Sequence, residues 1–394
     1  MSTRLFFFTK AYPYGKGETF IETEIEYLAK NFDQVIIIPF SGLDKSKREI
    51  PINCIVFKPI LRNKNKDILY NLLSFKSFKL YFKDFFSYKV YLSFKKIKFF
   101  LVDYSFTNMM LKSNTLEKIK APLEKNDILY FYWGKGWANI LPYIRYKNKS
   151  VIRLHGGDLY KYRYNGYIPI HKDIMEYADR LIFISQDGKS YLNSIYNNKL
   201  SKSYVSYLGT NDFGISKKST DGILRVLSCS NVIPLKRINK IFETLKLIKN
   251  IKIIWTHLGG GAGFNELKKL VELSTVINLD VHLKGHLKHT EVINYYKNNP
   301  IDIFINLSTT EGLPVSIMEA ISFDIPVIAT DVGGTSEIVN NNTGILVEND
   351  ISIIDLATLI ENTNFNLFKP RKFWLLNFNS QKNYINFIKQ HLTF

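Results

Sequence analysis

The chain has 394 residues, of which 46% are apolar, so it is long enough for two domains of roughly 150–200 residues, each with its own core. This composition argues against intrinsic disorder, and no apolar stretch reaches the roughly 18–20 residues that span a bilayer. The formal net charge is +18, but only ten of the 53 basic residues are arginines. Because polyanion sites more often recruit Arg, half or more of this charge indicates nothing beyond solubility.

Two features indicate the cellular compartment. The early apolar run Leu5–Phe8 is too short for the h-region of a signal peptide. Cys54 and Cys229 lie far apart and are flanked by apolar residues, which indicates buried free thiols in a reducing compartment. We therefore expect a cytoplasmic protein, soluble or peripheral on the inner face of the plasma membrane.

Short apolar strands alternate with amphipathic helices along the chain, which is typical of parallel α/β architecture. In the first half, strands are predicted near 3–9, 33–39, 127–132, 150–154, 179–184 and 203–207. In the second half, they are predicted at Leu224–Cys229, Ile251–His257, Val276–Leu283, Ile301–Leu307, Pro326–Thr330 and Gly344–Val347.

The polar stretch 209–222 separates the two series and shows no periodicity. We therefore predict two doubly wound, Rossmann-like domains, at 1–212 and 220–372, and a C-terminal helix over 373–394 that returns to the first domain. Ligands bind outside the carboxyl ends of strands in such sheets, so the expected site is a cleft across which the two domains face each other.

In chain order, the first candidate site is the loop Gly15-Lys16-Gly17-Glu18-Thr19, between the first strand and the first helix. Its glycines permit a close backbone approach to phosphate or sugar, and Gly17 is the candidate contact. The spacing does not match a P-loop, and Glu18 is alternatively a residue of the first helical turn.

The segment 61–120 departs from the alternating pattern. Between Leu61 and Phe100 there are ten Lys or Arg against two Asp, interleaved with twelve aromatic residues. One interpretation is a basic, aromatic helical insertion that lies on an anionic membrane surface. The other is an insertion whose aromatic residues face the core of the first domain and whose lysines are solvated.

His155 directly follows a buried strand and is followed by Gly156 and Gly157. This position at the carboxyl end of a strand favours a ligand contact, although a lone His is more often a packed or surface residue. Lys236 and Arg237 follow the strand Leu224–Cys229 and open the next helix, where cations run against the helix dipole. Phosphate binding explains such cations, with Lys236 favoured over Arg237.

The stretch from Glu311 to Glu319 follows a predicted strand that ends near Leu307. Pro314 suits the first turn of a helix, which leaves backbone N–H groups of Gly312 to Val315 free to bind a diphosphate. Carboxylates beside such a site accept hydrogen bonds from sugar and ribose hydroxyls. The alternative is an ordinary strand, loop and helix with one capping and one solvated glutamate.

The run E-G-L-P-V-S-I-M-E-A, followed by P-V-I-A-T-D-V-G-G-T-S-E, closely resembles the hallmark of the retaining GT-B glycosyltransferases of the "glycosyl transferases group 1" family, which includes many bacterial surface-polysaccharide enzymes. The resemblance extends to Y-P-Y-G-K-G-E-T-F, R-L-H-G-G-D-L-Y and S-C-S-N-V-I-P-L-K-R, and covers most of the chain except 45–125.

The resemblance implies a role for each matching residue. Glu319 would bind the donor ribose, Glu311 would contact the donor sugar, and His155 would donate a hydrogen bond to the transferred sugar. Backbone groups of Gly312, Leu313, Pro314 and Val315 would contact diphosphate and sugar, with Lys236 as the diphosphate cation. The family often has an arginine five residues before this lysine, where this chain has Asn231. We expect Asn231 to contact the donor from that position, with Arg237 as the candidate second cation.

No cofactor and no metal are implied. Gly259-Gly260-Gly261 resembles a glycine turn on the donor side, although a tight turn alone also explains it. His282, His286 and His289 are interrupted by Gly285, and alternate side chains of a strand point to opposite faces, so the spacing argues against a metal site.

The sequence thus predicts a metal-independent hexosyltransferase that moves a sugar from a nucleotide-diphosphate donor to a glycan or lipid-linked acceptor, in capsule, O-antigen or exopolysaccharide biosynthesis. The rival interpretations are a sugar-nucleotide epimerase or a glycan phosphorylase on the same scaffold, and a basic nucleic-acid-binding protein. The last would bind oligonucleotides with a steep salt dependence. The sequence names neither donor base, sugar, acceptor nor oligomeric state.

Overall fold

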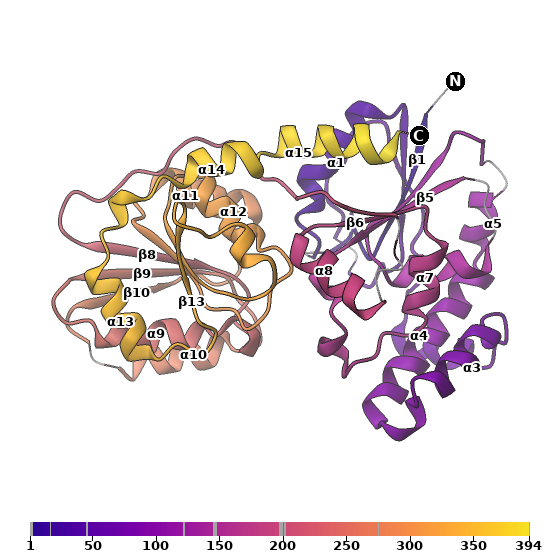
Figure 1. Ribbon diagram of the computed structural model, residues 1–394, viewed down its shortest axis with the longest axis horizontal. Helices are drawn as coiled ribbons and strands as arrows, with labels where there is room; N and C mark the ends of the chain where they lie inside the picture. The colour runs from indigo at the N-terminus through magenta and orange to yellow at the C-terminus, as the bar shows by residue number, and fades with distance from the viewer. Residues whose placement is uncertain are drawn as a thin grey trace. The chain divides into compact units, whose positions relative to one another are not determined.

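The computed structural model describes residues 3–15, 17–44, 46–120, 123–144, 148–196, 200, 202–274 and 276–393. The chain divides into two compact units. Unit 1 comprises the residues up to Tyr207 together with those from Tyr384 onward, and unit 2 comprises Leu208–Asn383. Each unit is an open parallel sheet with helices on both faces (Figure 1).

The sheet of unit 1 has the strand order β3-β2-β1-β4-β5-β6-β7, and every paired neighbour is parallel. Its strands are β1 (Arg4–Thr9), β2 (Gln34–Pro39), β3 (Cys54–Val56), β4 (Ile128–Phe131), β5 (Lys149–Leu154), β6 (Arg180–Phe183) and β7 (Ser203–Val205). The sequence predicted all of these except β3. That strand has only three residues, and Ile55 within it is exposed, so it shows neither a buried run nor an alternating pattern.

The helical segments of unit 1 are α1 (Ile21–Asn31), α2 (Lys64–Leu72), α3 (Phe78–Ser87), η1 (Val90–Leu92), α4 (Phe94–Lys112), α5 (Asn114–Lys120), η2 (Gly136–Tyr143), α6 (Gly156–Leu159), η3 (Lys161–Tyr164), α7 (His171–Tyr177) and α8 (Gln186–Ile195). The C-terminal helix returns to this unit, as expected. It brings Phe387, Ile388 and Leu392 into a core shared with α1 and the sheet. Phe387 lies 5.4 Å from the ring of Tyr130 on β4.

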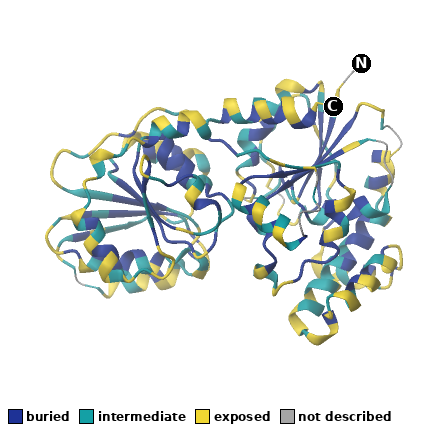
Figure 2. Ribbon diagram, viewed as in Figure 1, coloured by how far each residue is buried: buried dark blue, intermediate teal, exposed yellow. Residues whose placement is uncertain are grey.

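The insertion at 61–120 forms α2, α3, η1, α4 and α5. Some of its aromatic residues face inward, as one of the two interpretations predicted, and Tyr81 and Tyr104 join the core of unit 1. Many others face solvent, and Figure 2 colours much of these helices as exposed. The exposed large apolar residues here are Leu69, Tyr70, Leu73, Phe75, Phe78, Phe82, Phe86, Tyr91, Leu92, Phe94 and Leu101.

The sheet of unit 2 is also parallel, with the order β10-β9-β8-β11-β12-β13. Its strands are β8 (Leu224–Cys229), β9 (Ile253–Leu258), β10 (Leu279–Leu283), β11 (Ile303–Asn306), β12 (Val327–Thr330) and β13 (Gly344–Val347), which confirms all six predicted strands. Its helical segments are η4 (Pro234–Lys236), α9 (Ile238–Leu247), α10 (Phe264–Glu272), α11 (His289–Asn298), α12 (Val315–Ser322), η5 (Gly333–Glu337), α13 (Ile353–Asn362), η6 (Phe365–Leu367), α14 (Pro370–Asn377) and the beginning of α15 (Ser380–Phe387). Helix α15 continues into unit 1 from Tyr384 onward, and a last helical turn follows at Ile388–Leu392.

The polar stretch that we predicted as the boundary, 209–222, belongs to unit 2 along its whole length. Its Ser216 N–H donates to the Phe323 carbonyl, and Ser219 donates through both its N–H and its hydroxyl to Asp302. Among the described residues, no helix is both long and apolar enough to cross a bilayer.

Candidate active site

Hydrogen bonds between its own residues order the start of the loop that joins β11 to α12. Asn306 at the end of β11 accepts from the Ser308 N–H at 3.0 Å and from the Ser308 hydroxyl at 2.6 Å. Helix α12 begins directly after Pro314, and no side chain caps it. The N–H groups of Val315 and Ser316 therefore point out of the helix without an intrahelical acceptor, at its positive end.

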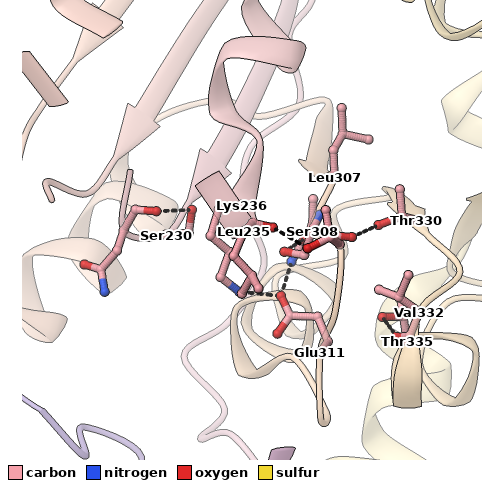
Figure 3. Close-up of polar contacts among 12 residues, drawn as sticks. Ser230, Leu235, Lys236, Leu307, Ser308, Glu311, Thr330, Val332 and Thr335 are labelled. Carbon is pink, nitrogen blue, oxygen red and sulfur yellow. Dashed lines mark hydrogen bonds and ion pairs between the residues drawn. The ribbon is translucent and has the colours of Figure 1, made fainter. Parts of the chain in front are cut away.

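Lys236 and Glu311 meet beside this helix start. Lys236 ends η4 in the loop after β8, and Glu311 lies in the loop after β11 (Figure 3). The Thr309 N–H donates to the Leu235 carbonyl at 2.9 Å, which ties the two loops together. The Lys236 ammonium forms an ion pair with the Glu311 carboxylate, and Nδ2 of Asn306 lies 3.4 Å from the same carboxylate oxygen. The structure thus brings together two residues that the sequence placed in one site.

Glu319 lies in the middle of α12 with its side chain 10% exposed. Its carboxylate oxygen is 2.7 Å from Nε2 of His289, the first residue of α11. From the sequence, His289 was considered only as a possible metal ligand, and its contact with Glu319 was not predicted. No local pattern signals it, because the two residues are thirty positions apart and are joined only by the fold.

Arg237 makes hydrogen bonds within unit 2 in this structure. Its backbone is left-handed, with φ 48°. The guanidinium donates to the carbonyls of Leu307, Ser308 and Asn349 and to the side chain of Asn349. Burial without an acidic partner lowers its pKa. In this structure Arg237 ties two loops together, and its role as a second phosphate cation stays a prediction. Asn231 is exposed on the turn after β8.

His155 lies at the end of β5, 5% exposed, and begins the short helix α6. Its ring packs among three aromatic rings, at centroid distances of 4.7 Å from Tyr132, 4.7 Å from Trp133 and 5.7 Å from Phe20. Burial, and to a lesser extent the charge of Arg153, holds its pKa well below the usual range. The imidazole is therefore neutral. Its Nε2 is buried and has no hydrogen-bond partner among the described residues.

Two carboxylates shape the loops around His155. Asp158 accepts from the backbone N–H groups of His155, at 2.7 Å, and Gly134. Glu18 accepts from the N–H groups of Ala11 and Tyr12, each at 2.8 Å, and from the Trp133 indole at 2.6 Å. The sequence had suggested a helical position for Glu18, but α1 begins only at Ile21. Gly17, next to Glu18, has no heavy atom within 4 Å of where a Cβ would be, so its backbone is open to an approaching ligand.

Residues 213–363 match the model of the family described as "Glycosyl transferases group 1". This stretch covers nearly all of unit 2, including both glutamates and Lys236. The match covers 151 of the 394 residues, so unit 2 is similar to this family.

Three known proteins are similar to this chain. It is 40% identical over 92 residues to the O-antigen biosynthesis glycosyltransferase WbnH of Escherichia coli, which is 23% of this chain and 24% of WbnH. The alignment thus spans about a quarter of that relative. The lipopolysaccharide outer core galactosyltransferase WaaB has a TM-score of 0.67 at 16% identity, over 98% of this chain and 99% of its own. Anabaena HepE, solved with UDP and glucose, has a TM-score of 0.67 at 14% identity, over 99% of both chains. These structural matches show the GT-B fold, with its two parallel-sheet α/β domains.

In unit 2, the glycine turn after β9 has a packing explanation. A Cβ on Gly259, where φ is 144°, would lie 1.8 Å from the Ser230 carbonyl oxygen, and one on Gly261 would lie 2.9 Å from Val232. The tight approach of two loops therefore requires these glycines. Across the described ranges, no three His, Cys, Asp or Glu side chains gather as metal ligands would. His289 contacts Glu319, and His282 is 3.0 Å from Asp280.

Proposed function

We propose that this protein is a retaining glycosyltransferase that moves a sugar from a nucleotide-diphosphate donor to a glycan or lipid-linked acceptor, in the synthesis of a cell-surface polysaccharide. The observation that carries the proposal is the Lys236–Glu311 ion pair beside the uncapped start of α12. It combines a cation, a carboxylate and free backbone N–H groups at one point of unit 2. The polysaccharide assignment follows from the similarity to WbnH, an O-antigen biosynthesis glycosyltransferase.

The diphosphate of the donor would replace the Glu311 carboxylate as the partner of Lys236. A diphosphate carries more charge than one carboxylate, and it also accepts hydrogen bonds from the N–H groups at the start of α12. As the bond between sugar and diphosphate breaks, negative charge grows on the diphosphate oxygen. Lys236 and the positive end of α12 stabilise that charge, so the proposed chemistry needs no metal and no cofactor.

Glu311 would act on the sugar once Lys236 turns to the diphosphate. A carboxylate beside the anomeric carbon stabilises the positive charge that develops on the ring as the leaving group departs. Glu319 would accept hydrogen bonds from the ribose hydroxyls, because an ionised carboxylate is an acceptor only. His289 holds the Glu319 carboxylate in place from the other side.

His155 would donate a hydrogen bond to a hydroxyl of the transferred sugar. The neutral tautomer with its one proton on Nε2 makes this donation, and a buried Nε2 without a partner among the described residues loses free energy that a ligand hydroxyl restores. The acceptor hydroxyl would then attack on the face from which the diphosphate leaves, which retains the anomeric configuration.

We further propose that the exposed apolar residues of the insertion contact an anionic membrane surface, on its cytoplasmic face, where lipid-linked acceptors are presented. Each Leu or Phe side chain that moves from water into lipid contributes up to about 1.5–3 kcal/mol, and nearby lysines add attraction to anionic lipids. The test is sedimentation with phosphatidylcholine vesicles, with and without phosphatidylserine. Replacing Leu73, Phe75 and Phe94, all more than 75% exposed, by Ser should abolish binding.

The matched control for that experiment replaces Leu273 and Ile277 by Ser. These residues are at least as exposed but lie in unit 2. The control should sediment like the unaltered protein. Equal sedimentation of the two variants would leave the insertion without a membrane role.

The test of the proposed reaction is a screen of UDP-, GDP- and ADP-sugars for thermal stabilisation and slow hydrolysis, beginning with UDP-sugars because HepE was solved with UDP. One nucleotide class should stabilise the protein, and Lys236→Ala should remove that stabilisation. Lys246→Ala, which removes a partly buried ammonium paired with Glu243, should not. NMR of the product anomer then tests retention, and an inverted product would contradict the proposed stereochemistry.

A further inference from the structure

Unit 1 contains a cavity of about 590 Å³ that the donor residues do not explain. It lies at the carboxyl edge of the sheet, where Thr9 ends β1, Lys10 follows β1 and Phe40 follows β2. The insertion closes it, because one face of α4, from Lys98 to Phe106, forms a wall. Its volume is in the range of small-molecule sites, which is about 300–1,000 Å³.

Eight aromatic side chains line the cavity. Among them, Trp133 comes from the loop after β4, Trp137 from η2, and Phe99 and Phe106 from α4. Flat apolar rings suit the C–H faces of a sugar, while their edges leave its hydroxyls free to hydrogen-bond. The lining therefore fits one or two sugar rings.

The charge of the cavity is strongly positive. Four lysines line it, namely Lys10, Lys64, Lys98 and Lys135, against the single carboxylate of Asp103. Among the described residues, no carboxylate lies within 4.0 Å of any of the four ammonium groups. Lys135 contacts only neutral groups, the hydroxyl and the ring of Tyr164, whose centroid is 4.2 Å away.

Asp103 does not balance these lysines. Its carboxylate is engaged in the wall, where it accepts from Tyr81 at 2.6 Å and from Asn139 at 2.8 Å. Burial raises its pKa to about 6, so part of its charge is lost in mildly acidic solution. The cavity thus keeps an excess of three positive charges at neutral pH and more below it.

We infer that this cavity binds the acceptor of the proposed transfer and that the acceptor sugar carries a negative charge, a carboxylate or a phosphate, which lies against these lysines. The identification of this ligand as the acceptor rests on the proposed function. The anion chemistry rests on the cavity alone: a neutral glycan would leave three excess ammonium charges without a partner.

Binding is best followed by tryptophan fluorescence of the full chain at low salt, because two of the four tryptophans, Trp133 and Trp137, line the cavity. The probes are methyl glucuronide, glucose 1-phosphate, neutral methyl glucoside and inorganic phosphate. We expect at least one anionic sugar to bind about tenfold or more tightly than the glucoside, which corresponds to about 1.4 kcal/mol. Tighter binding of methyl glucuronide would show that the cavity recognises a carboxylate. Tighter binding of glucose 1-phosphate would show that it recognises a phosphate.

The variant Lys64→Gln with Lys98→Gln should lose the preference for the anionic sugar. Both residues are exposed, so the fold is expected to persist. The matched control is Lys66→Gln with Lys95→Gln, which removes equal charge from the same two helices outside the cavity lining and should behave like the unaltered protein. Equal affinity for all sugars, equal loss in both variants, or inorganic phosphate binding as tightly as the best sugar would each overturn the inference.

The same proteins distinguish this inference from the proposed function. Nucleotide binding should be unchanged in the Lys64/Lys98 variant, because these residues lie in unit 1. If anionic sugars bind the cavity but no nucleotide sugar binds the protein, the proposed transfer fails while the anion site stands. If nucleotide sugars bind and anionic sugars do not, the proposed transfer stands and the cavity assignment fails.

Discussion

Glu319 and His289 form a hydrogen bond of 2.7 Å between the middle of α12 and the start of α11. This contact fixes the carboxylate that we assign to the ribose, and its loss would let the side chain rotate. We expect His289→Ala to weaken binding of the donor nucleotide about 3- to 10-fold, the contribution of one hydrogen bond. Isothermal titration calorimetry measures this, with His282→Ala, which is exposed, as the control. An unchanged affinity in His289→Ala would remove His289 from the donor site.

The Lys236–Glu311 pair leads to a more specific prediction. If diphosphate and Glu311 compete for the same ammonium group, Glu311→Gln should bind the nucleoside diphosphate product as tightly as the unaltered protein or more tightly. Its transfer rate should nevertheless fall about 100-fold or more, because the carboxylate also stabilises the transition state.

Lys236→Ala should instead lose both affinity and rate. Titration of the product and steady-state kinetics of both variants separate these effects. A Glu311→Gln protein that binds the product more weakly would show that Glu311 and the diphosphate do not compete.

The strands and the adjacent residues of this site show which features could be predicted from the sequence. Parallel strands are buried runs with regular spacing, so twelve strands were predicted and only the three-residue β3 was missed. Lys236 and Arg237 are chemically similar neighbours, yet Lys236 pairs with Glu311, while Arg237, whose backbone is left-handed, donates to carbonyls of two other loops. A local sequence does not encode that turn. Likewise, the His289 contact and the cavity wall formed by α4 depend on chain segments brought together only by folding.

Arg237→Ala tests this division of roles. The side chain donates to three backbone carbonyls, and its removal leaves them with fewer partners in a partly buried position. We expect a loss of about 1–3 kcal/mol in the free energy of unfolding and little change in nucleotide affinity. Lys236→Ala should show the opposite pattern. Chemical denaturation and calorimetry on both variants measure it, and a stable Arg237→Ala protein with weakened binding would place Arg237 in the phosphate site.

His155 should affect the transfer step more than nucleotide binding. His155→Phe keeps a ring among Phe20, Tyr132 and Trp133 but removes the N–H donor. We expect kcat to fall about 10- to 100-fold, the contribution of one hydrogen bond strengthened in the transition state, while affinity for the nucleoside diphosphate stays the same. His155→Gln, which retains a donor, should recover part of the rate. Equal rates in His155→Phe and the unaltered protein would limit His155 to packing.

The pH dependence of the cavity follows from Asp103. Burial raises its pKa to about 6, while the hydrogen bonds from Tyr81 and Asn139 and the charge of Lys135 act in the opposite direction, and the charge of Asp84 adds to the rise. Above pH 6 the ionised Asp103 cancels one lysine charge, and below pH 6 it does not. Affinity for methyl glucuronide should therefore increase as the pH falls from 7.5 to 5.5, a range about two units or more above the ordinary pKa of a sugar carboxylate.

Asp103→Asn should bind methyl glucuronide with the higher affinity at every pH in this range. The stability change has a defined sign as well. A folded-state pKa above the unfolded value means that the contribution of Asp103 to stability is present at low pH and is lost as the pH rises through about 6. Thermal unfolding should accordingly show Asp103→Asn gaining stability over the unaltered protein at pH 8 but not at pH 4. A glucuronide affinity that follows the same pH profile in both proteins would show that another group controls the charge of the cavity.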